Sequence, residues 1–294
     1  MKFTSIGEKN ATILDNLGTH FVQNKFLRNF VKKNCIIRTV MSGHSKWSTI
    51  KRKKGALDAK RGQVFTKLAN AITIAVREGG GGDPTSNFKL RLAIDQAKTA
   101  NMPKDNIERA IERGLGKGTG GQLESVAYEG YGPGKIAFIA QVTTDNRNRA
   151  SSQLKAVVER AGGHFASQGA VSWMFEDVGL IVVGKDGKSA DEIFETAADA
   201  GAQDIEDAGD SVEIYSKPNE LDKVRSALSE KGLNVQSAEL YKKPVQTVEI
   251  EDAETAKKVL EFVEKLEDLD DVQKVYSNFD IPDSLLAGIQ GSIK

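Results

Sequence analysis

Cationic side chains follow one another closely between residues 46 and 67. They are Lys46, Lys51, Arg52, Lys53, Lys54, Lys60, Arg61 and Lys67. Ammonium and guanidinium groups neutralise phosphates and release the counterions held by a nucleic acid, which gives an affinity that falls steeply with salt. Because such contacts position a protein without reading the bases, the run predicts nucleic-acid binding with little sequence selectivity.

Two aromatic side chains, His44 and Trp47, stand at the start of this run. Each could stack on an exposed base, and such a stack contributes roughly 1–3 kcal/mol. The alternative for Trp47 is packing on a helical domain as a core or hinge residue. Arg147 and Arg149 present a similar choice, because they follow Asp145-Asn146 at an expected strand-to-helix turn. They are candidates for a nucleic-acid contact or for a structural role in that turn.

The formal charge of the chain is zero, but the charge is unevenly distributed. Residues 41–118 contain 16 Lys and Arg against seven Asp and Glu, whereas residues 119–294 contain 18 against 32. Because the screening length is about 8 Å at physiological salt, an acidic body several such lengths away does not cancel the field of a basic head. The asymmetry therefore favours a polyanionic partner for the head, although a solvated basic face is the simpler alternative.

The composition disfavours several other classes of protein. No apolar run approaches the roughly 18 residues of a membrane helix, and Cys35 is the only cysteine. The three histidines lack Cys or His neighbours at metal-ligand spacing. Residues 116–121 satisfy the GxGxxG pattern but follow an expected helix instead of a strand, so we interpret them as a linker. We predict no catalytic residues, no metal site and no cofactor, and hence no enzyme.

Residues 1–40 show no clear helical or strand period, and the dense patterning of the chain begins at Met41. This extension is compatible with an organellar presequence or with an over-extended reading frame, and we favour the second. We expect it to be disordered or untranslated. The predicted localisation is the cytoplasm, or an organellar matrix if residues 1–40 are a genuine presequence.

Residues 41–118 are predicted to form a basic domain of about three helices. Apolar residues recur at helical spacing over residues 58–78, and a glycine-rich elbow follows at Gly79–Gly82. A second helix is expected over residues 87–100. A third should begin after Met102-Pro103, with Asp105 as its cap, and end at Gly114.

The acidic remainder is predicted to hold two α/β domains. Residues 177–244 show the order βαββαβ, which is typical of a ferredoxin-like domain, and Ser189 with Glu192 indicates a capping box. Residues 119–176 and 245–294 together give a second copy of the same order, with strands at 170–175 and 245–250. The expected fold class is therefore α+β, with a three-helix domain followed by two ferredoxin-like domains, one inserted in the other.

Several motifs from residue 41 to the C-terminus resemble the YebC family, whose members are called probable transcriptional regulatory proteins in bacteria and translational activators in mitochondria. The motifs are Gly43-His-Ser-Lys-Trp47, Asp58-Ala-Lys-Arg-Gly62, Phe65-Thr-Lys67, Gly80-Gly-Gly-Asp-Pro84, Asn101-Met-Pro-Lys-Asp-Asn-Ile-Glu108, Tyr131-Gly-Pro-Gly134 and Thr144-Asp-Asn-Arg-Asn-Arg149. The resemblance implies a helical domain followed by two α/β domains. The chain departs from it in the 40-residue extension and at Lys135, where a further glycine is expected.

Two functions remain open at this stage. The resemblance implies a DNA-binding regulator of transcription, yet the helices show no helix-turn-helix pattern. The alternative is a ribosome-associated translation factor whose basic head contacts ribosomal RNA. We expect a nucleic-acid partner, DNA or ribosomal RNA, with the ribosome itself as a candidate. We expect no membrane partner and a monomeric protein.

Overall fold

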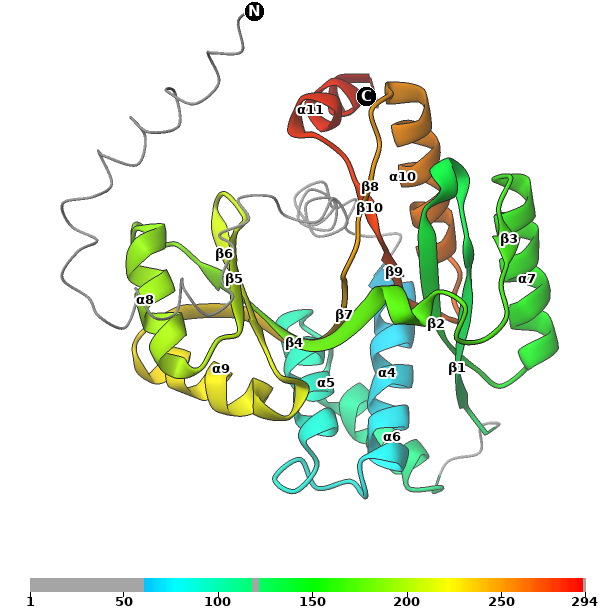
Figure 1. Cartoon of the computed structure of the whole chain (residues 1–294). Helices are drawn as coiled ribbons and strands as arrows, with labels where there is room; N and C mark the ends of the chain where they lie inside the picture. Colours follow the sequence, from blue (N-terminus) through cyan, green and yellow to red (C-terminus); the bar gives the residue numbers. More distant parts are fainter. Residues whose placement is uncertain (1–60, 118–121, 293–294) are drawn as a thin grey trace, which may run out of the picture. The chain divides into compact units, whose positions relative to one another are not determined.

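The computed structural model describes residues 61–117 and 122–292 of the chain (Figure 1). The extension 1–40 and the basic run up to Lys60 lie outside the described residues. Within the described ranges, no helix is long and apolar enough to cross a membrane. The predicted α+β class is confirmed, with helices first and two four-stranded antiparallel sheets after them, beside a short parallel pair of strands.

Three helices make up the helical domain, residues 61–117. They are α4 (Arg61–Glu78), α5 (Phe88–Thr99) and α6 (Lys104–Gly114), and their apolar faces meet in a core that includes Ile72, Leu90 and Ile107. In the elbow between α4 and α5, Gly80 and Gly81 have φ angles of 86° and 136°, which side chains rarely tolerate.

Buried Asn87 fixes the angle between α4 and α5. Its Oδ1 accepts a hydrogen bond from the Leu90 backbone N–H at 3.0 Å and so caps α5. Its amide donates to the carbonyls of Ala75 and Gly81, both at 2.8 Å. One side chain therefore satisfies backbone groups at the end of α4, in the elbow and at the start of α5.

The start of α6 differs from the prediction. Pro103 occupies the N-cap position and no side chain caps the helix. Proline fixes its own φ near the value that the chain needs there, so the helix starts at Lys104 and Asp105 already lies in the first turn. In that position the Asp105 carboxylate still interacts favourably with the helix dipole.

The inserted domain, residues 175–244, has the predicted βαββαβ order. Its elements are β4 (Phe175–Gly184), α8 (Ala190–Ala200), β5 (Asp204–Asp207), β6 (Ser211–Ser216), α9 (Leu221–Glu230) and β7 (Asn234–Pro244). The antiparallel sheet has the order β5-β6-β4-β7, which is that of a ferredoxin-like domain. The capping box of Ser189 and Glu192 is confirmed.

The outer domain, residues 123–174 and 245–292, differs from the predicted second copy. Its sheet has the order β3-β1-β2-β9. The elements are β1 (Glu124–Tyr131), β2 (Ala137–Thr144), α7 (Arg147–Arg160), β3 (His164–Phe165), β8 (Val248–Glu249), α10 (Ala253–Glu267), β9 (Val272–Ser277), β10 (Phe279–Asp280) and α11 (Asp283–Ser292). Helices α7 and α10 contribute to the core on one face of this sheet.

The strands predicted at 170–175 and 245–250 were wrong in detail. A 3-10 turn at Ser172–Met174 runs directly into β4, and the second segment forms only β8, which pairs with β10 outside the main sheet. Strand β1 was not predicted. Its sequence carries Glu129 and Gly130 at buried positions, so its apolar alternation is weak.

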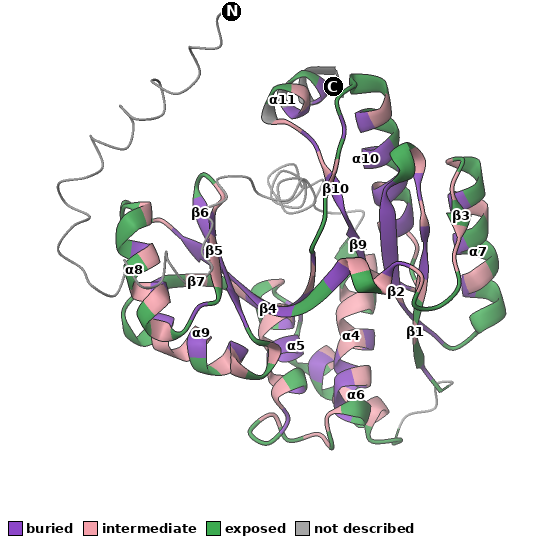
Figure 2. Cartoon of the chain, viewed as in Figure 1, coloured by how far each residue is buried: buried purple, intermediate pink, exposed green. Residues whose placement is uncertain are grey.

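The domains share buried surfaces. Tyr215 and Tyr241 of the inserted domain lie in one apolar cluster with Ile139 and Tyr276 of the outer domain. Leu92 of α5 belongs to the core of the inserted domain. Figure 2 shows the resulting burial, with β2 buried almost throughout.

Candidate nucleic-acid interface and the cleft between the domains

Two of the ten predicted site residues lie within the described part of the chain. Arg61, the first residue of α4, is exposed, and its guanidinium carbon lies 5.4 Å from the centre of the Phe65 ring. This cation–π contact holds the charge at the helix start. The other described residue is Lys67. Outside the described residues are His44, Lys46, Trp47, Lys51, Arg52, Lys53, Lys54 and Lys60.

Lys67 is half-buried and points toward the outer domain. Its Nζ donates a hydrogen bond to the backbone carbonyl of Glu267, at the end of α10. One turn earlier, the Gln63 amide donates to the Asp270 carboxylate at 2.9 Å. These contacts give Lys67 a structural role in joining α4 to the outer domain, and a phosphate would have to displace one of them.

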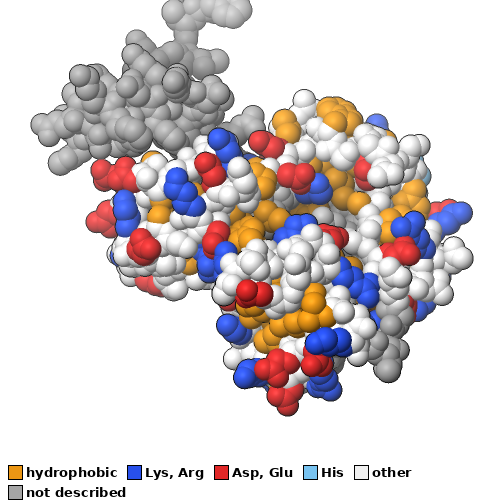
Figure 3. Space-filling view, turned by 90° about the horizontal axis from the view of Figure 1, so that it is seen from below, with side chains coloured by type: hydrophobic (Ala, Val, Ile, Leu, Met, Phe, Trp, Pro, Cys, Tyr) orange, Lys and Arg blue, Asp and Glu red, His pale blue; other side chains and the backbone are white. Residues whose placement is uncertain are grey.

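The surface of the helical domain is mixed in charge. Residues 61–117 contain ten Lys and Arg against six Asp and Glu, and Figure 3 shows the two kinds interspersed on the face that carries these helices. Residues 41–60 contain six Lys and Arg against one Asp. More than half of the net positive charge of the head therefore belongs to its first twenty residues.

Helix α6 follows α5 after a four-residue connection, a spacing compatible with a helix-turn-helix motif. Its exposed face nevertheless carries Asp105, Glu108 and Glu112 beside its cations. A recognition helix in a major groove passes between phosphates, and three carboxylates there would be repelled. The face of α6 is therefore poorly suited to reading DNA.

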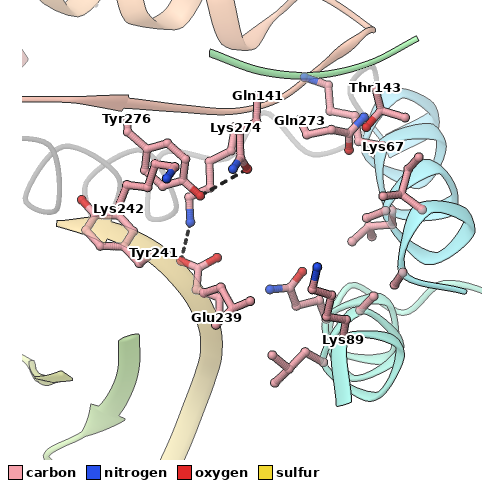
Figure 4. Close-up of a pocket in the computed structure, with 18 of the residues that line it drawn as sticks. Lys67, Lys89, Gln141, Thr143, Glu239, Tyr241, Lys242, Gln273, Lys274 and Tyr276 are labelled. Carbon is pink, nitrogen blue, oxygen red and sulfur yellow. Dashed lines mark hydrogen bonds and ion pairs between the residues drawn. The ribbon is translucent and has the colours of Figure 1, made fainter. Parts of the chain in front are cut away.

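A cleft of about 970 Å³ opens where the three domains meet. The helices α4 and α5 form one wall, with Lys67 and Lys89 (Figure 4). The strands β7 and β9 form another wall, where the Lys274 ammonium lies 2.5 Å from the Glu239 carboxylate and Tyr276 bonds Gln141 at 3.4 Å. Burial and the nearby Glu239 carboxylate raise the pKa of Tyr276, which keeps its hydroxyl protonated.

The charge of this cleft does not suit a nucleic-acid strand. Its charged lining residues are Lys67, Lys89, Lys242, Lys274, Glu78, Asp177, Glu213, Glu239, Glu267 and Asp268. Six carboxylates against four ammonium groups disfavour a polyanion. The sequence did not indicate this cleft, because its lining residues are scattered from Gln63 to Tyr276.

The two arginines of the strand-to-helix turn are held by ion pairs. Arg149 bonds Asp271 at 3.0 Å and Asp145 at 2.9 Å, and these two carboxylates raise its pKa. Arg147 pairs with Glu124 on β1. The geometry favours the structural alternative for Arg149, since it ties the start of α7 to the loop before β9.

Within residues 61–117 and 122–292, no group of three or more His, Cys, Asp or Glu side chains is arranged to hold a metal ion. In these ranges, clustered acidic side chains form ion pairs with neighbouring basic side chains. One such cluster is in the inserted domain, where the Lys243 ammonium lies 2.7 Å from Asp204, 2.8 Å from Glu206 and 3.6 Å from the centre of the Tyr215 ring.

Comparisons with known sequences cover nearly the whole chain from residue 45. Residues 45–117 match the family model described as the TACO1/YebC protein N-terminal domain. Residues 123–279 match the model described as the TACO1/YebC second and third domain.

Individual relatives agree with these matches. A protein of Rubrobacter xylanophilus named "Probable transcriptional regulatory protein" is 49% identical over 252 residues, covering 85% of this chain and 100% of the relative. A relative of similar name from Sulfurihydrogenibium sp. is 51% identical with the same coverage. The crystal structure of a conserved hypothetical protein from Aquifex aeolicus superposes with a TM-score of 0.72 and 45% identity, covering 77% of this chain and 93% of that chain.

Proposed function

Because the chain belongs to the TACO1/YebC family, whose relatives are named as regulatory proteins, we propose that it is a nucleic-acid-binding regulator of gene expression. The observation that carries the proposal is the separation of charge. Residues 41–60 hold six cations against one carboxylate, while the two sheet domains are acidic. Phosphate neutralisation by the first part of the head is the contact that this distribution supports.

The names of the relatives support transcription as the regulated process, with DNA as the partner. The exposed face of α6 supports a second candidate. Because Asp105, Glu108 and Glu112 disfavour insertion into a major groove, binding directed at phosphates with little base selectivity is the better match. Such binding suits ribosomal RNA, and the protein would then act on translation in association with the ribosome.

The test compares two charge-reversed variants of the full chain. In the first, Lys51, Arg52, Lys53 and Lys54 become Glu. In the matched control, four exposed lysines of the outer domain, Lys155, Lys257, Lys258 and Lys265, become Glu. Ribosome co-sedimentation at graded salt and a mobility-shift assay with promoter DNA are measured for both.

We expect the first variant to lose binding and the control to retain it. Retention on ribosomes with only weak, sequence-blind DNA binding by the unmodified protein identifies translation as the process. Selective promoter binding identifies transcription. If the unmodified protein binds neither RNA nor DNA in dilute buffer, the proposal is wrong.

A further inference from the structure

The loop that joins β3 to β4 can be followed in Figure 1. It carries an exposed tryptophan. The side chain of Trp173 is 64% exposed, the largest value among the exposed large apolar residues of the described chain. Exposing an indole ring to water is unfavourable, and tryptophan is enriched at binding hot spots. None of the contacts described above uses this ring.

A buried carboxylate holds the backbone of the loop that carries Trp173. Glu129 on β1 accepts hydrogen bonds from the backbone N–H groups of Gly169 at 2.9 Å and of Val171 and Ser172 at 3.0 Å each. Burial alone would raise the pKa of Glu129, but these three bonds and the nearby Lys242 ammonium together lower it. The loop is therefore anchored at three backbone positions by an ionised carboxylate.

The ring itself is also oriented. The indole Nε1 donates to the carbonyl of Ala170 at 2.9 Å, so the only polar group of the side chain is already bonded within the loop. The neighbouring Val171 is fully buried, and the Met174 carbonyl accepts a hydrogen bond from Val245 at 2.8 Å. The hydrogen bond holds the exposed ring in a fixed orientation, and such preorganisation lowers the entropic cost of binding.

The surroundings of the ring match a small planar group better than a protein surface. Before Trp173 in the chain, the exposed residues Ser167, Gln168 and Gly169 carry no charge, and Val245 is the neighbouring exposed apolar residue. After it, Glu176 and Asp177 are exposed carboxylates, and Asp177 is paired with Lys242 at 2.6 Å. Protein hot spots are ringed by several further apolar contacts that exclude water, whereas the described chain exposes Val245 as the apolar neighbour here. A single base can stack on one aromatic side chain, and every base has a π face with which to do so.

We propose that Trp173 stacks on an unpaired nucleobase of the bound nucleic acid. This inference rests on the proposed function, because the basic head supplies the phosphate contacts that bring a strand to an otherwise acidic domain. The stack gives the outer domain a direct contact with bases in single-stranded segments. It predicts a preference for unpaired over fully paired nucleic acid.

The chain offers a direct reporter for this contact, because it contains two tryptophans, Trp47 and Trp173. In the W47F variant, Trp173 is the sole source of indole fluorescence. We would titrate this variant with a 15-nucleotide single-stranded DNA of mixed sequence and with an abasic strand of the same length. Base stacking quenches indole emission, whereas phosphate contacts alone leave the ring unstacked.

We expect the base-containing strand to quench Trp173 emission and the abasic strand to leave it unchanged. Within the W47F background, W173A should weaken binding roughly tenfold, as the loss of one stacked base predicts, and W173F should weaken it less. Affinity is measured independently by the anisotropy of a labelled strand. Thermal unfolding of each variant excludes a loss of folding as the cause.

Three outcomes would overturn the inference. The first is binding with unchanged Trp173 emission and an unchanged Kd for W173A, which leaves the proposed function intact. The second is low accessibility of Trp173 to acrylamide in the free W47F protein, which means that a protein segment covers the ring. The third is that no variant binds either strand, whereas the proposed function is decided separately by the ribosome and promoter-DNA measurements.

Discussion

Nη2 of Arg91 on α5 lies 2.7 Å from Oδ2 of Asp222 on α9, and this ion pair joins the helical domain to the inserted domain. Arg225 bonds the other oxygen of the same carboxylate at 2.9 Å and reaches Asp95 on α5 at 3.3 Å. Four charges thus alternate across one helix–helix contact, beside Leu92, which is buried in the core of the inserted domain. This contact joins those of Gln63 and Lys67 with the outer domain in fixing the position of the helical domain.

We expect Arg91 and Asp222 to be energetically coupled. Both side chains are about one-third exposed, so a double-mutant cycle with Arg91→Gln and Asp222→Asn should give a coupling of about 1 kcal/mol in the free energy of unfolding. The more exposed pair Lys104–Glu108 on α6 is the control, with about 0.3–0.5 kcal/mol expected. Equal coupling in the two pairs would show that the contact between α5 and α9 contributes nothing beyond a surface pair.

Glu129→Gln should destabilise the β3–β4 loop. The carboxylate accepts three backbone N–H groups, whereas an amide directs its own N–H₂ at one of them, so a loss of about 1–3 kcal/mol is expected at neutral pH. Because the pKa of Glu129 is lowered in the folded state, its contribution is present above the ordinary value of 4.5 and is lost as pH falls below it. The stability difference between wild type and E129Q should therefore shrink between pH 5 and pH 3, as measured by urea denaturation. A difference that is constant with pH would contradict the account.

Glu206 should show the opposite dependence on pH. Burial raises its pKa, and the neighbouring Asp204 adds to this, against the attraction of Lys243. Because its pKa is raised in the folded state, the contribution of Glu206 to the free energy of unfolding is fully present below pH 4.5. This contribution is lost as the pH rises through the raised pKa. E206Q does not titrate, so its stability relative to wild type should increase as pH rises from 4.5 toward neutrality. Denaturation of both proteins across this interval measures how the difference between their free energies of unfolding changes with pH. A change of opposite sign would show that the ion pair of Glu206 with Lys243 dominates.

Local and long-range interactions differ in how far the sequence could predict them. The inserted domain was predictable because its strands alternate regularly and its helices carry local caps, such as Ser189 with Glu192. Strand β1 was missed because Glu129 is buried for a long-range reason, its bonds to residues 169–172, which no local pattern reveals. The contact of Lys67 with Glu267 likewise joins residues 200 positions apart. Charge spacing carries no information about the domain opposite, so it predicted a phosphate contact for Lys67 but not this hydrogen bond, and the phosphate contact stays a prediction.

Lys135 shows how a sequence departure can mark backbone strain. The resemblance led us to expect glycine at this exposed position, and the residue has a φ of 60°, in the left-handed region. A side chain there costs about 1–2 kcal/mol relative to glycine. Lys135→Gly should therefore be about 1 kcal/mol more stable than Lys135→Ala in thermal unfolding, since both variants remove the charge and only glycine relieves the strain. Equal stability of the two variants would mean that the turn adjusts to the side chain.

Arg61 and Lys67 should respond differently to substitution, although both belong to the predicted cationic run. Arg61 is exposed at the start of α4 and is free to reach a phosphate, so Arg61→Ala should reduce the slope of log Kd against log salt by about 0.7–0.9. Lys67→Ala should leave that slope unchanged, because its ammonium is bonded to the Glu267 carbonyl, and it should instead lower the unfolding temperature through loss of the contact between α4 and the outer domain. Nucleic-acid titrations at five salt concentrations, together with thermal unfolding, separate the two effects. A reduced slope for Lys67→Ala would mean that the ammonium leaves Glu267 on binding, and that the helical head moves relative to the outer domain when it meets its partner.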